Sequence, residues 1–124
     1  MQARERFGYN EQEWASAKDR LRSVLIETAK RESLISYKNL SVKLDAERVT
    51  ADSQILSSLL FEVTREEFLN GNGLLSAVVV KSGPQPFPGD GFFRCAEICG
   101  KKVFGRERLW IQELRRLYSL HHKE

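Results

Sequence analysis

Residues Leu74 to Gly100 read LLSAVVV, then KSGPQPFPGDG, then FFRCAEICG, and this stretch decides the fold. The apolar run Leu74–Val80 ends in three consecutive β-branched valines, which favour a strand. Because the run is apolar on both faces, we expect the strand to be covered on both sides or to have at least one edge packed under a helix. All three prolines of the chain follow within Gly83–Gly91, so a shaped loop connects the strand to a helix. Asp90 is the predicted N-cap of that helix, which we expect to end near Gly100.

Helical spacing of apolar residues dominates the first part of the chain. Residues 11–31 carry apolar side chains at intervals of three and four, which predicts an amphipathic helix, and Asn10 is its candidate cap. Leu34–Ile35 forms a short extended segment after it. Ser36 can then cap a brief helix that runs through Leu44.

Two further helices are expected beyond this point. Thr50 or Asp52 opens a long helix that reaches Leu69, and the glycines of the segment 70–73 stop it, because glycine adopts the left-handed conformation that ends a helix. From Arg106 the last segment again has helical spacing. We expect its inward residues to be Trp110, Leu114, Leu117 and Tyr118, and its outward residues to be Arg108, Arg115 and Arg116.

Composition places the chain among ordinary globular proteins. It has 124 residues, of which 41% are hydrophobic and 30% charged, and a chain of this length can bury a core without disulfides or metals. The elements together predict one α+β domain over residues 1–124, dominated by helices around a small sheet. No apolar run approaches the roughly 20 residues of a membrane span, and residues 1–6 lead into no signal-peptide core. We therefore expect a cytoplasmic protein without membrane association.

The order of these elements resembles a winged-helix scaffold, which implies a loosely winged-helix-like fold. Leu34–Ser41 is similar to the strand-to-helix entry of that scaffold, residues 50–69 occupy the place of the recognition helix, and Leu74–Phe93 lies where a wing would be. Residues 74–80 with Pro88–Phe93 are also similar to a pattern of small uncharacterised bacterial proteins, which implies no activity.

Two features depart from the winged-helix pattern. The helix in the recognition position carries one basic residue, Arg65, against four acidic residues, so it would be repelled by phosphate. These acidic residues are Asp52, Glu62, Glu66 and Glu67. In addition, the first strand of the wing is apolar where a wing would be polar, which indicates that it belongs to the core.

The junction between the proline-rich loop and the following helix holds the predicted partner-binding residues. They are Phe87, Gly89, Asp90, Gly91 and Phe92. Backbone N–H groups converge at such a junction and can bind an anion, although the Asp90 carboxylate can satisfy the same donors as a structural cap. Phe87 and Phe92 form either a hydrophobic docking spot or part of the core.

The two cysteines and two histidines do not make a catalytic or metal-binding signature. Cys95 and Cys99 lie one helical turn apart, and we expect both to be reduced, largely buried and without metal, since no second pair completes four ligands. We expect His121 and His122 to lie on a solvent-exposed tail. No sequence motif links these histidines to the cysteines, as would be expected of a base that activates a nucleophile. No cofactor is expected.

Basic residues are concentrated toward the two ends of the chain. Lys and Arg outnumber Asp and Glu by seven to five in residues 1–31 and by nine to five in residues 74–124, whereas residues 32–73 have four against seven. The candidate nucleic-acid-binding residues lie in the C-terminal third, with Trp110 and Tyr118 between them. They are Lys101, Lys102, Arg106, Arg108, Arg115 and Arg116. A solvated surface of mixed charge is the competing interpretation.

These observations favour a small cytoplasmic, non-enzymatic binding or regulatory module that acts through a protein partner or as a homo-oligomer. The alternative is a nucleic-acid-binding protein that uses the basic C-terminal face. An enzyme comes third, because the sequence holds no complete catalytic motif.

Overall fold

A computed structural model describes residues 7–45, 48–51 and 53–122. These residues form five α-helices, a 3₁₀ helix and two short strands. In chain order they are α1 (Glu11–Lys30), β1 (Ile35–Ser36), α2 (Tyr37–Leu44), α3 (Gln54–Leu69), η1 (Leu75–Val78), β2 (Val79–Val80), α4 (Asp90–Ile98) and α5 (Arg106–Leu120). The helix-dominated α+β fold with a small sheet is therefore confirmed.

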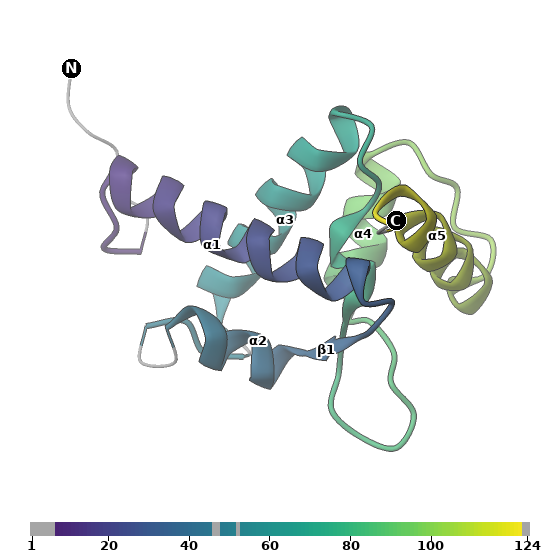
Figure 1. Cartoon of the computed structure of the whole chain (residues 1–124), viewed down its shortest axis with the longest axis horizontal. Coiled ribbons are helices and arrows are strands. Elements are labelled where there is room, and N and C mark those ends of the chain that lie inside the picture. Colours follow the sequence, from purple (N-terminus) through teal and green to yellow (C-terminus); the bar gives the residue numbers. More distant parts are fainter. Residues whose placement is uncertain (1–6, 46–47, 52, 123–124) are drawn as a thin grey trace.

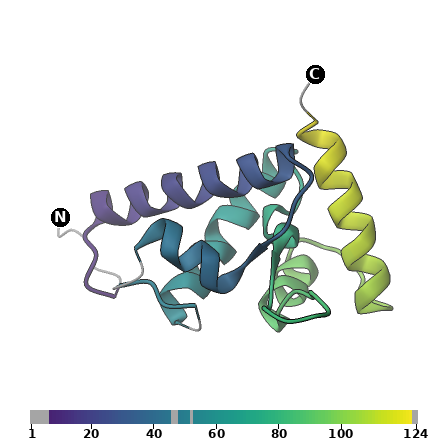
Figure 2. The ribbon, with the colours of Figure 1, turned by 60° about the horizontal axis from the view of Figure 1, so that its bottom comes forward.

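The helices surround η1, which lies near the middle of the fold. Helix α1 contacts both α2 and α3 (Figure 1). In Figure 2, α1 runs along the top with α2 and α3 beneath it, and α5 packs across one end. The segment η1 contacts α1, α3 and α5 at once. None of the helices in the described ranges is long and apolar enough to cross a membrane.

The predicted caps of α1 and α2 are confirmed, and the predicted cap of α3 is wrong. The Asn10 side chain accepts a hydrogen bond from the N–H of Glu13, whose own side chain accepts from the N–H of Asn10, and this reciprocal pair is a capping box. Ser36 caps α2 as expected. Helix α3 is capped by Ser53, one to three residues after the predicted positions, because its Oγ accepts from the third N–H of the helix. Of the two predicted caps, Asp52 lies outside the described residues.

The end of α3 follows the sequence prediction. Asn70 is the C-cap, and Gly71 and Gly73 have φ angles of 82° and 83°, the left-handed region that favours glycine. Gly73 has a second constraint, because a Cβ there would lie 3.1 Å from the Leu120 side chain at the end of α5.

The predicted strand Leu74–Val80 is wrong in most of its length. Residues Leu75–Val78 form the 3₁₀ helix η1, and only Val79–Val80 pair as a strand, parallel to β1 with Ile35 opposite Val79. A strand would send successive side chains to two faces only, whereas one helical turn directs them toward three surrounding helices. The Trp110 indole on α5 also donates a 2.8 Å hydrogen bond to the Ala77 carbonyl within this turn.

The wing of the winged-helix resemblance is not seen in the described part of the chain. Residues 81–89 form bends and coil between β2 and α4, and the two strands are parallel, whereas a wing is a hairpin. The resemblance therefore rests on the order of the helices alone and is not confirmed.

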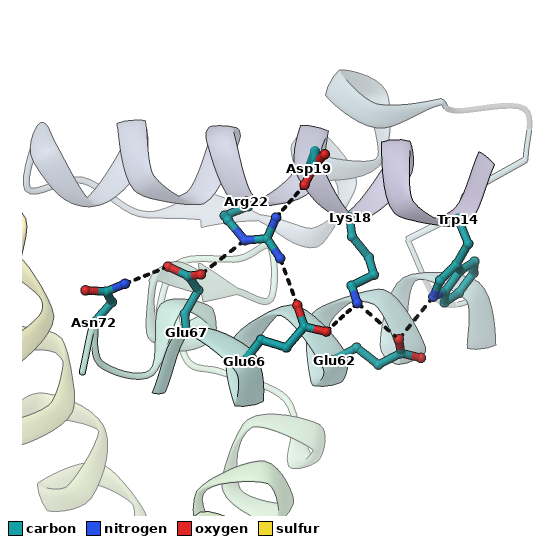
Figure 3. A network of polar contacts seen from close by, with 8 residues as sticks. All are labelled: Trp14, Lys18, Asp19, Arg22, Glu62, Glu66, Glu67 and Asn72. Carbon is teal, nitrogen blue, oxygen red and sulfur yellow. Dashed lines mark hydrogen bonds and ion pairs between the residues drawn. The ribbon is translucent and has the colours of Figure 1, made fainter. Parts of the chain in front are cut away.

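The acidic side of α3 faces α1 and pairs with its cations. Arg22 of α1 lies 2.9 Å from Glu66 and 3.2 Å from Glu67, and Lys18 pairs with Glu66 as well (Figure 3). Glu67 is buried, so its charge needs this partner. Its other oxygen accepts a hydrogen bond from the Asn72 amide.

One turn earlier, Glu62 continues the same network. It accepts a 3.1 Å hydrogen bond from the Trp14 indole and lies 3.6 Å from the Lys18 ammonium (Figure 3). Three of the acidic residues that argued against phosphate binding, Glu62, Glu66 and Glu67, are thus used within the fold, where they hold α3 against α1. These acidic residues therefore do not determine the charge of the other surfaces of the protein.

Candidate functional site

The two phenylalanines of the predicted docking spot pack inward. Phe92 is only 3% exposed, and Phe87 is half-buried with its ring 5.5 Å from the rings of both Phe93 and Trp110. This aromatic cluster anchors the loop to α4 and α5. Phe92 therefore belongs to the core, and only part of the Phe87 side chain is accessible to a partner.

Asp90 does not cap α4, contrary to the prediction. Gly89 is the N-cap, and Asp90 is the first helical residue, with an exposed carboxylate that accepts a 2.7 Å hydrogen bond from Arg106 at the start of α5. That hydrogen bond, followed by the charge of the same guanidinium, lowers the pKa of Asp90. The carboxylate therefore joins the starts of α4 and α5. Gly91, next along the helix, is exposed and faces open space.

Gly89 instead contacts a residue far away in the sequence. Its N–H donates a 3.0 Å hydrogen bond to the hydroxyl of Tyr37 on α2, and a Cβ at this position would lie 3.0 Å from the same oxygen. Burial raises the pKa of Tyr37, against the lowering effect of this hydrogen bond, and the charge of Asp90 raises it further. At neutral pH the hydroxyl keeps its proton and can donate it to an acceptor.

Tyr37, Gly89, Gly91 and Phe92 all line a cleft between α3 and α4. The cleft has a volume of about 540 Å³. Its apolar lining comes from both helices and includes Leu60, Phe61, Phe92, Cys95 and Ile98. Ile98 is 57% exposed, so a large aliphatic side chain faces solvent at this site. We call this site the α3–α4 cleft.

The charged groups of the α3–α4 cleft are mainly basic. Lys81 and Arg94 line it with exposed side chains, and neither forms an ion pair with another described residue. Glu62 also lines the cleft, but its carboxylate interacts with Trp14 and Lys18 of α1. An apolar lining with two available cations is complementary to a ligand that is apolar and negatively charged.

The cysteines have different environments although they lie one turn apart. Both are free; Cys95 is 2% exposed, and Cys99 is half-buried. Burial, and secondarily the neighbouring Cys99, raises the pKa of Cys95 to about 12, so the group in the cleft is a thiol and a poor nucleophile. Within the described ranges, no three His, Cys, Asp or Glu side chains lie close enough to hold a metal ion.

We expect one thiol of the native protein to react quickly with Ellman's reagent and the other only upon unfolding. Cys99 should be the reactive one, because Cys95 is buried and protonated. Thiol counting with and without denaturant tests this, and Cys99→Ser should abolish the fast phase. Two equally fast thiols would contradict the different burial of the two side chains, and stoichiometric zinc in the purified protein would contradict the metal-free expectation.

The histidines lie away from the cysteines. His121, expected on an exposed tail, is half-buried with Nε2 2.9 Å from the Asn72 carbonyl, so that prediction is wrong. It follows the end of α5, which packs against the Gly73 turn. His122 is exposed, with Nδ1 3.8 Å from the Glu32 carboxylate.

The six basic residues predicted to bind nucleic acid do not share one role. Lys101 lies 3.3 Å from the buried Glu113 carboxylate and 5.5 Å from the Phe68 ring, and Arg106 pairs with Asp90 and lies over the Phe93 ring. These two cations support the fold. The other four have exposed side chains, namely Lys102 in the loop before α5, and Arg108, Arg115 and Arg116 on α5.

Sequence reasoning missed the residues that give the α3–α4 cleft its character. Tyr37, Lys81 and Ile98 come from different segments and meet only through packing. Ile98 did carry a signal, because an aliphatic residue that falls off the buried face of an amphipathic helix is a candidate for contact with a partner.

Comparisons of this chain with protein families, with curated proteins and with solved structures found no match. The function is therefore inferred from the geometry of the surfaces described above.

Proposed function

We propose that this protein is a small binding module that acts through a protein partner, and that the α3–α4 cleft receives an apolar, acidic segment of that partner. The observation that carries the proposal is the combination of an apolar cleft, a largely exposed Ile98 and two cations, Lys81 and Arg94, that have no ion-pair partner among the described residues. Gly89, Gly91 and Phe92, predicted to contact a partner, lie at this cleft. Phe87 and Asp90 support its edge from the loop and from the start of α4.

The dimensions of the cleft suit a few side chains of a peptide. Its volume of about 540 Å³ falls within the range of ligand sites, roughly 300 to 1,000 Å³. Burial of an exposed aliphatic side chain contributes about 1.5 to 3 kcal/mol when it is complete. Two carboxylates that meet Lys81 and Arg94 would fix the direction of the segment and raise its association rate.

Binding is favoured over catalysis by the groups that line the cleft. Its thiol, Cys95, has a raised pKa, and its acid, Glu62, already holds α1. The hydroxyl of Tyr37 can donate a hydrogen bond to a ligand carboxylate or carbonyl. These groups can orient a ligand by hydrogen bonding without acting as a nucleophile–base pair.

Selection from a random peptide library displayed on phage tests the proposal. We expect the selected peptides to combine large apolar residues with Asp or Glu. Ile98→Asp should weaken them at least about tenfold, because it places a charge in the apolar lining and repels their carboxylates. Leu69→Asp is the matched control, since Leu69 is an exposed leucine of α3 that does not line the cleft.

Two outcomes would contradict the assignment of the cleft. One is a selection that enriches no apolar, acidic peptide. The other is a set of peptides that bind the Ile98→Asp variant as tightly as the parent. A concentration-dependent increase in mass by sedimentation, abolished by Ile98→Asp, would identify the partner as a second copy of the chain.

A further inference from the structure

Helix α5 presents a second surface, on the side opposite the core and separate from the α3–α4 cleft. Arg108, Ile111 and Arg115 follow each other at intervals of three and four residues, so they lie along one side of the helix, and Phe104 directly precedes its N-cap, Gly105. All four are exposed, and Arg116 is exposed beside them. We call these five residues the α5 outer face. The inner side of the helix contacts η1 (Figure 2).

The charge of the α5 outer face is positive. Arg108, Arg115 and Arg116 make no ion pair with any described residue, and the neighbouring exposed acid is Glu107. The second acid of the helix, Glu113, is buried on the inner side with Lys101. These three arginines are therefore directed toward solvent, where guanidinium groups bind phosphate well.

Phe104 is an exposed aromatic residue, and the solvation that accounts for exposed arginines does not account for an exposed phenylalanine. It is 92% exposed, the highest value among the exposed large hydrophobic residues of the described chain. A phenylalanine in this state adds little to the core, and its ring can stack against another planar group. Stacking of a nucleic-acid base on an aromatic side chain contributes about 1 to 3 kcal/mol and tolerates any base.

We propose that the α5 outer face binds single-stranded nucleic acid, with the three arginines on phosphates and Phe104 stacked on a base. Arginines beside an exposed aromatic are the recurrent combination in proteins that bind single strands. A single strand is favoured over a duplex because the faces of paired bases are already stacked on each other and cannot accept the Phe104 ring. This activity does not depend on the cleft, which is built from other helices.

Fluorescence anisotropy with labelled oligo-dT and with a duplex of the same length tests the inference. We expect the parent protein to bind oligo-dT more tightly than the duplex at low salt. Phe104→Ala should weaken binding to oligo-dT about 5- to 100-fold with an unchanged dependence on salt, because it removes stacking without removing charge. Phe104→Trp should retain binding.

The arginines give a different signature. Arg115→Ala with Arg116→Ala should reduce the log–log slope of affinity against salt by about 0.7 for each phosphate that the protein no longer neutralises. Arg31→Ala with Lys43→Ala is the matched control, because it removes two exposed cations from the end of α1 and from α2 and should change affinity little. Unchanged melting temperatures would show that the exposed-site variants remain folded.

Several results would overturn the inference. They are the absence of oligo-dT binding at low salt, equal losses of affinity in the control pair and in the arginine pair, and an affinity that Phe104→Ala leaves unchanged. Binding to vesicles that contain phosphatidylserine, without binding to oligo-dT, would assign the face to an anionic membrane surface instead.

Discussion

Replacement of Val79 by Asp is expected to unfold most of the protein at moderate temperature. Val79 is fully buried where β2 pairs with β1, directly after η1. A carboxylate at this position must stay unpaired in an apolar site or become protonated, and we expect a loss of about 4 kcal/mol or more. Domains of this kind have a total free energy of unfolding of only about 5 to 15 kcal/mol.

Two companion variants keep this prediction measurable if Val79→Asp does not fold. Val79→Ala removes methyl groups without adding charge and should cost about 2 kcal/mol in urea unfolding. Val42→Asp makes the same valine-to-aspartate change at a residue of α2 that is 65% exposed, and it should cost less than about 1 kcal/mol. If Val79→Asp and Val42→Asp had similar stabilities, the interior position of β2 would be wrong.

The elements that sequence analysis predicted well are those with local causes. Asn10 and Ser36 cap their helices through hydrogen bonds that span three residues, and Gly71 ends α3 through its own backbone conformation. Such signals lie within a few residues of the structure that they determine. The inward residues of α5 likewise follow from helical periodicity, and its outward arginines are exposed as expected.

The errors have long-range causes. Residues 75–78 have strand composition but adopt a 3₁₀ turn, because three helices surround them and the Trp110 indole, 33 residues away, binds their backbone. Asp is a common N-cap residue, yet in the fold the Asp90 carboxylate accepts a hydrogen bond from Arg106, and Gly89 is the N-cap of α4. A sequence pattern shows which residues are apolar or can cap a helix. It does not show which distant residues the fold will bring into contact with them.

The same limit applies to the candidate sites. Of the predicted loop residues, Gly89, Gly91 and Phe92 line the α3–α4 cleft, whereas its charges and the rest of its apolar lining come from residues of α3, of α4 and of the segment after β2. The contact of Gly89 with Tyr37 joins residues 52 positions apart. In the basic set, the structural roles of Lys101 and Arg106 depend on acids and rings that only the fold brings near.

Charge reversal at the cleft should invert the ligand preference of the protein. In the double variant Lys81→Glu with Arg94→Glu, two favourable contacts with an acidic peptide become two repulsions. Exposed ion pairs contribute up to about 1 kcal/mol each and repulsion costs a similar amount, so we expect affinity to fall roughly 30- to 1,000-fold. A peptide with Lys in place of its acidic residues should bind the double variant better than it binds the parent.

The matched control is Lys102→Glu with Arg108→Glu, which changes the net charge equally at exposed positions that do not line the cleft. The most direct test of a binding site between α3 and α4 is a titration of both peptides, the acidic and the lysine-substituted one. Each peptide is titrated against the parent, the cleft variant and the control. We predict that the cleft variant alone reverses its preference from the acidic to the basic peptide. Equal weakening of the acidic peptide by the cleft variant and the control, or no weakening by either, would contradict a binding site between α3 and α4.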